Sequence, residues 1–164
     1  MAFLDDLYDI HPIDIAESIA RAEEWDFERG SDETISFAIE GAWRNYLLLL
    51  DHVPSENSLR LMCRFDMAPQ HENLPKLYEM LNTVNAACWI GSFTWDAELQ
   101  HMVFRYGLLV GEDQLVDHDQ IATMISAAVL SVERFLPAFE LAIWTDKSPD
   151  EALQTAIAQA YGHA

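Results

Sequence analysis

The residues that could do chemistry in this chain are few, and none forms a recognised motif. Zinc sites place cysteines or histidines at short spacing, whereas Cys63 and Cys88 stand apart, as do His11, His52, His71, His101, His118 and His163. His52 and His71 flank predicted loops, so we expect them in solvent. The six glycines form no phosphate-binding loop, and the G-x-S-x-G nucleophile motif is absent. The sequence predicts no catalytic, metal or cofactor site.

Asp117, His118 and Asp119 come closest to a reactive group. A carboxylate beside an imidazole can raise the pKa of the imidazole or help it bind a metal. Adjacent residues on a helix do not face each other, however. Aspartate is a preferred helix N-cap, so we interpret the triplet as a helix start. Ser148 and Glu151 likewise predict a capping box at the start of a last helix. His101 and Arg105 could share a sheet face, but this pair alone specifies no reaction.

Four aromatic residues are more informative: Trp43, Trp89, Phe93 and Trp95. In the segment WIGSFTW the last three alternate, so they would share one face of a strand. Sheet core is the simpler interpretation for Trp89 and Phe93. The alternative is a binding groove or a dimer contact, where tryptophan is enriched. We therefore take these four residues as the candidate partner or dimer surface.

Hydrophobic periodicity predicts the elements that position these residues. Apolar residues at helical spacing predict helices over 11–25, 72–88, 117–135 and 148–161. Alternation predicts strands over 33–39, 58–67, 89–95 and 100–110, and a segment that is apolar on both sides of its pleat predicts a central strand over 43–51, covered on both faces. The strands over 33–39, 43–51 and 58–67 should form an antiparallel meander. Pro137 should kink or break the third helix, although 138–144 could continue it. The order α-β-β-β-α-β-β-α-α predicts an α+β domain, with helices packed on an antiparallel sheet.

Length and charge limit the possible partners. The 164 residues fit a single domain, 1–164, with 1–10 as a lead-in segment. Nine basic and 28 acidic residues give a net charge of -19, which disfavours nucleic acid and membrane surfaces. The acids could simply maintain solubility, or they could attract a basic partner segment. The longest apolar run is Leu47 to Leu50, and acids occupy the start where a signal peptide needs Lys or Arg, so we expect a cytoplasmic protein.

Several segments together resemble the bacterial YbjN-domain family. They are HPIDIAESIARAEEWDFER, GAWRNYLLLL, WIGSF followed by MVFRYGLLV, and ERFLPAFELAIWTDKSPDEAL. They cover about residues 11–155 in the family's order. The most specific are the W-x-G-x-F pattern (Trp89, Gly91, Phe93) and the stretch from Pro137 to Glu151.

The resemblance implies a fold similar to type III secretion chaperones, which are small acidic dimers that hold an extended client segment. It also implies a regulator of sensory transduction, and it transfers no catalytic residue. The leading hypothesis is thus a non-enzymatic, homodimeric module that binds a protein partner. One alternative is a small-molecule sensor or enzyme with a pocket between sheet and helices. Another is a dedicated secretion chaperone.

Overall fold

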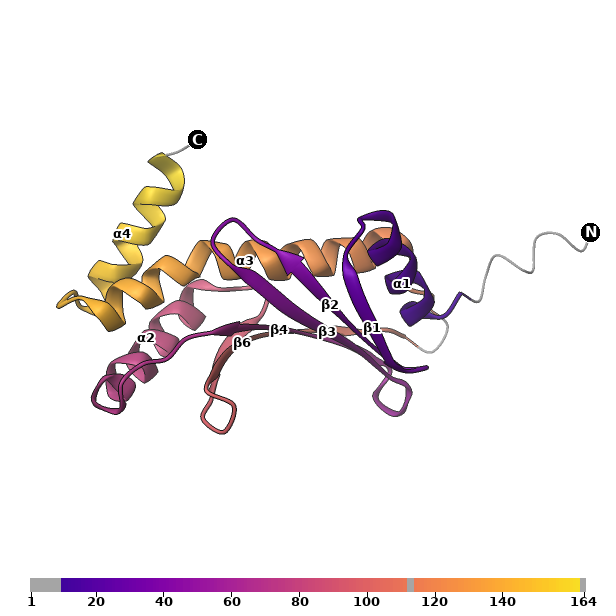
Figure 1. Ribbon diagram of the computed structural model, residues 1–164, viewed down its shortest axis with the longest axis horizontal. Coiled ribbons are helices and arrows are strands. Elements are labelled where there is room, and N and C mark those ends of the chain that lie inside the picture. The colour runs from indigo at the N-terminus through magenta and orange to yellow at the C-terminus, as the bar shows by residue number, and fades with distance from the viewer. Residues whose placement is uncertain (1–9, 112–113, 163–164) are drawn as a thin grey trace, which may run out of the picture.

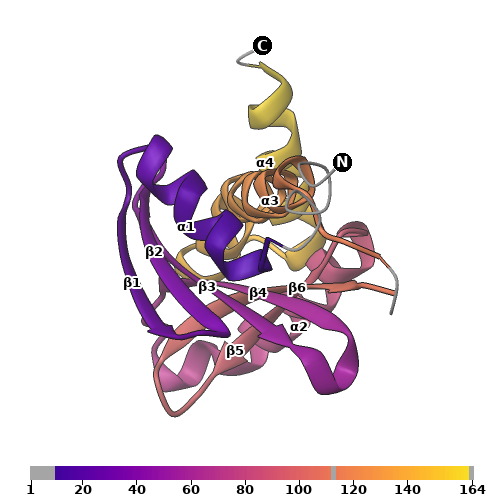
Figure 2. The same cartoon turned by 90° about the vertical axis from the view of Figure 1, so that its right-hand side faces the viewer.

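Six strands form one antiparallel sheet, in the spatial order β1-β2-β3-β4-β6-β5. The computed structural model describes residues 10–111 and 114–162, so most of the lead-in segment 1–10 lies outside the described residues. Helices α1 and α3 lie over one face of the sheet, and α2 and α4 lie near the far end of α3 (Figure 1). The end view shows α1 beside α3 on that face (Figure 2). The predicted α+β class is confirmed.

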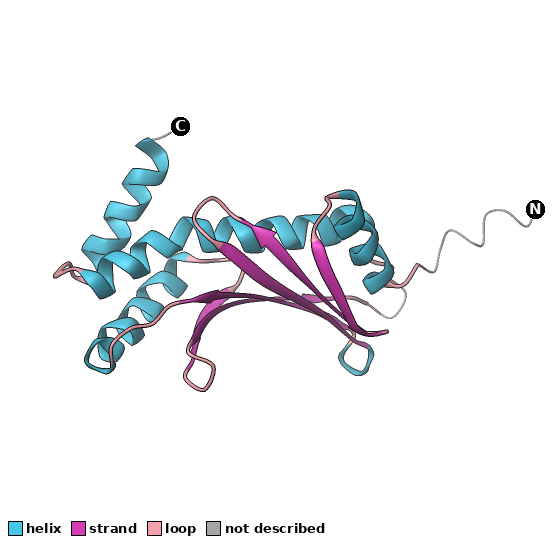
Figure 3. Ribbon diagram, in the orientation of Figure 1, coloured by secondary structure: helices cyan, strands magenta, loops and turns pink. Residues whose placement is uncertain are grey.

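Helices and strands follow the predicted order with one addition at the start of the sheet (Figure 3). The helices are α1 (Pro12–Ala22), α2 (Leu74–Ala87), α3 (His118–Trp144) and α4 (Pro149–Gly162). The strands are β1 (Asp26–Ser31), β2 (Thr34–Glu40), β3 (Asn45–Val53), β4 (Ser58–Asp66), β5 (Ser92–Asp96) and β6 (His101–Leu109).

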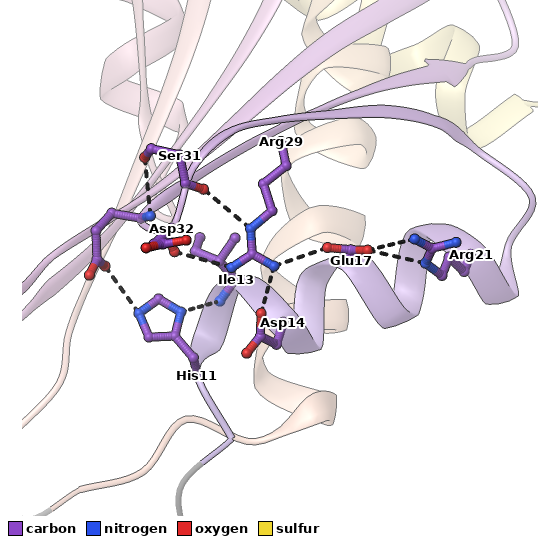
Figure 4. A network of polar contacts seen from close by, with 9 residues as sticks. His11, Ile13, Asp14, Glu17, Arg21, Arg29, Ser31 and Asp32 are labelled. Atoms are coloured by element: carbon purple, nitrogen blue, oxygen red, sulfur yellow. Dashed lines mark hydrogen bonds and ion pairs between the residues drawn. The ribbon is translucent and has the colours of Figure 1, made fainter.

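The sequence pattern did not predict strand β1. The predicted three-stranded meander therefore has four strands. The residues of β1, DFERGS, contain a single large apolar side chain, Phe27, and so show no alternation. Backbone pairing with β2 forms the strand instead, with Phe27 opposite Phe37. Arg29 of β1 also donates to Asp14 and Glu17 of α1 at 2.6 and 3.0 Å, which ties this edge strand to the first helix (Figure 4).

Helix α3 runs without a break through Pro137, so the predicted break is wrong and the predicted continuation over 138–144 is confirmed. Proline removes one helical hydrogen bond and crowds the preceding turn. Leu136, Ala138 and Phe139 around it are almost completely buried. This packing outweighs the local penalty, because most helical stability in proteins comes from burial of an apolar face.

By length and composition, helix α3 is also long and apolar enough to cross a membrane, although it contains no long unbroken apolar run. Its most apolar 18-residue window has a mean hydropathy of 1.4, and half of that window is buried inside the protein. The buried side chains pack against α1, β4 and β6. Helix α3 therefore has the burial pattern of a central core helix.

Both predicted helix caps are present. Asp117 accepts a hydrogen bond from the Gln120 amide at 2.8 Å, and the Gln120 side chain accepts one from the Asp117 amide at 3.0 Å. Ser148 and Glu151 form the same reciprocal pair at the start of α4. The hydrogen bonds from Ser148 hold the pKa of Glu151 below its usual value. The Asp117 triplet is thus a helix start, as interpreted from the sequence.

The two cysteines differ in accessibility, which leads to a labelling prediction. Cys63 is fully buried on β4, and burial raises its pKa to about 12, whereas Cys88 is partly exposed after α2. Because the thiolate is the reactive form, iodoacetamide at pH 8 should modify Cys88 first and Cys63 only on unfolding. Peptide mass spectrometry with and without urea measures this order. Equal labelling of both cysteines in the native protein would contradict it.

Candidate functional site

The loop between β2 and β3, residues 41–44, is held against the middle of α3. The Glu133 carboxylate accepts a hydrogen bond from the Ala42 amide at 2.5 Å. Two helical turns further along, Glu140 pairs with the guanidinium of Arg44 at 2.5 Å. These two contacts from one helix face hold both sides of Trp43, whose side chain remains 69% exposed.

The loop approaches its neighbours so closely that position 41 has room only for glycine. A Cβ atom on Gly41 would lie 2.1 Å from the Tyr46 ring and 2.7 Å from the Glu133 carboxylate. Burial, followed by the charge of Glu133, raises the pKa of Tyr46 to about 12. The phenol therefore stays neutral beneath the loop, which approaches Tyr46 and Glu133 closely at Gly41.

An open groove runs beside this loop, between α3, α4 and Trp43; we call it the α3–α4 groove. Its volume is about 580 Å³. Its walls include Trp43, Pro137, Leu141, Trp144 and Ala156. Trp144 is 56% exposed at the end of α3. Two large aromatic side chains from segments about 100 residues apart thus flank one apolar depression, an arrangement that neither segment shows alone.

A second depression lies between the end of α2 and the exposed side of α3; we call it the α2–α3 groove. It has a volume of about 790 Å³, and its lining includes Trp89, Ile90 and Leu130. Trp89 is 94% exposed and Leu130 is 65% exposed. Arg134 lines both grooves. The outer surface of α3 therefore carries two adjacent apolar depressions.

The W-x-G-x-F pattern has a different structural basis at each of its positions. Strand β5 begins at Ser92, so the prediction that Trp89 shares a strand face with Phe93 and Trp95 is wrong. A Cβ atom on Gly91 would lie 2.4 Å from the Arg105 backbone oxygen, so glycine lets the chain pass close to β6. The Asn85 side chain then bonds both the amide and the carbonyl of Phe93, at 2.8 and 3.0 Å.

Phe93 belongs to the core and not to a partner surface, since it is 1% exposed. Its ring centroid lies 5.0 to 6.4 Å from four other rings, those of Phe65, Phe104, Phe135 and Phe139. Trp95 is partly buried against the same core. Of the four aromatic candidates, Trp43 and Trp89 reach the surface, and they line separate grooves.

His101 and Arg105 lie on β6 on the face of the sheet away from the helices, since the intervening residues Met102 and Phe104 are buried in the core. His101 Nδ1 lies 2.8 Å from an Asp66 carboxylate oxygen. His118 lies 3.6 Å from Asp119, and both side chains are exposed. His101 and Arg105 therefore do not lie between the sheet and the helices, where a sensor or enzyme pocket built on this pair would need them.

Comparison with known proteins agrees with this architecture. A family model described as "YbjN: Putative bacterial sensory transduction regulator" matches residues 12–141. Comparison with curated proteins gave no match. A solved structure described as "Crystal structure of YbjN, a putative transcription regulator from E. coli" shares the fold at a TM-score of 0.53 and 13% identity. That alignment covers 95% of this chain and 96% of the other. The extent of the family match shows that this chain belongs to the YbjN family.

Proposed function

We propose that this protein is a non-enzymatic regulator that acts by binding a basic, amphipathic helix of a protein partner in the α3–α4 groove. The observation that carries the proposal is the pair of exposed tryptophans, Trp43 and Trp144, flanking that groove. Tryptophan is among the residues most enriched at binding hot spots. An apolar groove of this kind suits the hydrophobic face of a helix.

Charge supports a basic partner. The charged side chains that line the groove are Glu133, Glu140 and Arg134, so acids outnumber bases there, and the whole chain carries a net charge of -19. A field of this sign attracts cationic segments and increases their association rate. Binding by such a surface should weaken as salt is added, because exposed charges are screened within about 10 Å at 0.1 M ionic strength.

Regulation through a protein fits this chain better than direct contact with DNA. The family is described as a sensory transduction regulator, and the structural relative as a transcription regulator. DNA contact requires free lysines and arginines along the phosphates. The chain has only nine basic residues. Within residues 10–111 and 114–162, four of them pair with carboxylates, namely Arg21, Arg29, Arg44 and Arg60.

The proposal includes a cytoplasmic, homodimeric adaptor with a fold like that of type III secretion chaperones. Its support is the resemblance in element order and the apolar surface around Trp89, Ile90 and Leu130, which is separate from the partner groove. A dedicated secretion chaperone would be a special case, distinguished by a secreted client. Light scattering of the purified chain measures the oligomeric state.

Site-specific photocrosslinking tests the proposed groove. A photoreactive phenylalanine analogue at position 43 should crosslink a protein segment in bacterial cells, and mass spectrometry should identify it as basic with apolar residues at helical spacing. The synthetic segment should bind the purified protein, and Trp144→Ser should weaken that binding about 30-fold, since a hot-spot tryptophan contributes about 2 kcal/mol or more. Fluorescence anisotropy measures both affinities.

Trp89→Ser is the matched control, because it removes an exposed tryptophan outside the α3–α4 groove. It should leave the affinity for the segment unchanged. Crosslinking from position 43 only to a second copy of this chain would replace the proposed partner by self-association. Equal loss of affinity in both variants, or none in Trp144→Ser, would show that the groove is not the binding site.

A further inference from the structure

A cluster of two histidines and one glutamate joins three segments far apart in the sequence. His11 is the N-cap of α1, Glu33 lies in the turn between β1 and β2, and His52 lies in β3. His11 Nε2 lies 3.1 Å from a Glu33 carboxylate oxygen, and His52 Nδ1 lies 2.6 Å from the same oxygen. His52 is therefore mostly buried and hydrogen-bonded, whereas the sequence predicted it in solvent.

The backbone fixes this cluster in place. The His52 amide donates to the Glu33 carbonyl at 2.8 Å, and the Ser31 hydroxyl accepts from the Glu33 amide at 3.1 Å. The two imidazole rings pack edge to face with centroids 5.0 Å apart. Figure 4 shows the His11 ring beside Ile13 at the start of the helix. All three ligand-type side chains are partly buried, so they are held in position but remain reachable from solvent.

Two of the three distances between candidate ligand atoms are close to those of a metal site. The three candidate ligand atoms lie within 4.8 Å of one another. A tetrahedral ion with bonds of about 2.0–2.2 Å separates its ligand atoms by about 3.3 Å. The two nitrogen-to-oxygen distances lie within about 0.7 Å of that value, and the two ring nitrogens lie at most 4.8 Å apart. An ion could therefore replace the two hydrogen bonds to Glu33 with only small side-chain movements.

Nearby charges also permit a cation. Arg29 is the basic residue that bonds to the same turn, through the carbonyls of Ser31 and Asp32. Its guanidinium is already paired with Asp14 and Glu17, and those hydrogen bonds raise the pKa of Arg29. Together with the net charge of -19, this leaves the Glu33 carboxylate in an environment that favours a bound cation.

We propose that His11, Glu33 and His52 bind a divalent transition-metal ion, with zinc as the best match, and that the ion fastens α1 to the sheet. Two imidazoles and one carboxylate suit zinc and its neighbours better than magnesium or calcium, which prefer oxygen ligands. Because the cluster is partly exposed, water completes the coordination. The site is independent of the α3–α4 groove.

Binding has a specific consequence for the helix cap. His11 Nδ1 accepts a hydrogen bond from the Ile13 amide at 3.2 Å, so in the neutral ring the proton is on Nε2. A metal at Nε2 moves that proton to Nδ1, and the ring then repels the Ile13 N–H. The proton of His52 likewise moves from Nδ1 to Nε2. Both rings stay neutral, and the Ile13 amide loses its partner.

Zinc titration of the untagged chain at pH 7 tests the site. We expect one ion per chain by calorimetry and, at zinc a hundred times the Kd, a rise in Tm of about 5–10 °C. Glu33→Gln, His52→Gln and His11→Asn should each weaken binding at least tenfold, since losing even an outer-shell partner typically costs 10–100-fold. Asparagine at position 11 keeps a good helix N-cap.

His101→Gln is the matched control, because it disrupts another histidine–carboxylate pair and should leave zinc affinity unchanged. In the NMR spectrum of the unmodified protein, zinc should shift the Ile13 amide and the His11 and His52 rings, a readout that needs no variant to fold. No binding by the unmodified protein, or affinity unchanged in the three ligand variants, would overturn the proposal. So would zinc-dependent shifts confined to other histidines.

Discussion

Phe93→Ala should destabilise the fold by about 3–5 kcal/mol, the usual range for truncating a buried phenylalanine. The ring lies at the centre of the aromatic core, between β4, β6 and α3, so its loss opens a cavity that these elements cannot easily fill. Its backbone is also fixed by Asn85. Urea denaturation followed by circular dichroism measures the change in the free energy of unfolding.

Trp89→Ala is the matched control within the same W-x-G-x-F pattern. Trp89 is 94% exposed in the single chain, so at protein concentrations where the chain is monomeric its removal should change the free energy of unfolding by no more than about 0.5 kcal/mol. If both variants lost several kcal/mol, Trp89 would be part of the core in solution. If neither did, Phe93 would not be the centre of the packing.

Gly91→Ala should destabilise the protein by about 1–3 kcal/mol, the typical cost of overpacking. The added Cβ atom would lie 2.4 Å from the Arg105 backbone oxygen and 2.5 Å from the Phe104 ring. The oxygen belongs to β6, which is paired on both sides, so it cannot move without disturbing the sheet. Urea denaturation again measures the effect.

Gly107→Ala provides the matched control on β6 itself. A Cβ atom there meets nothing within 4 Å, and no described glycine has a positive φ. Alanine should therefore stabilise the protein by about 0.4–1 kcal/mol, chiefly by restricting the unfolded chain. The two glycine variants should thus have effects of opposite sign. Similar effects at both positions would contradict the close approach at Gly91.

Sequence patterns predicted most of the elements because a helix or strand that is buried on one side carries apolar residues at regular spacing. The alternation of Ile35, Phe37 and Ile39 with less buried neighbours marks β2, and the capping residues mark the starts of α3 and α4. The prediction that β3 is covered on both faces is wrong, because Leu47 is 47% exposed. Prediction failed where contacts between distant segments determine the local structure. Strand β1 is formed by pairing with β2 despite its polar sequence, and α3 continues past Pro137 because the residues around it are buried.

The candidate surface was predicted only in part. Tryptophan content indicated that some aromatic side chains would be exposed, but alternation placed Trp89 in a strand that begins three residues later. The exposure of Trp43 depends on Glu133 and Glu140 of α3, about 90 residues away in the sequence. Such a contact produces no pattern in the sequence around Trp43, so the exposure of Trp43 could not be predicted.

The sequence by itself determined the acidic charge, the α+β class, the helix caps and, by resemblance, the YbjN family. Only the tertiary structure decided which chemistry-bearing residues meet. Periodicity records which side of an element is buried, but not which distant segment lies beside it. His11, Glu33 and His52 are isolated in the sequence, and the sheet and α1 bring them within hydrogen-bonding distance. Three residues that show no metal-site spacing in the sequence therefore form the candidate metal site.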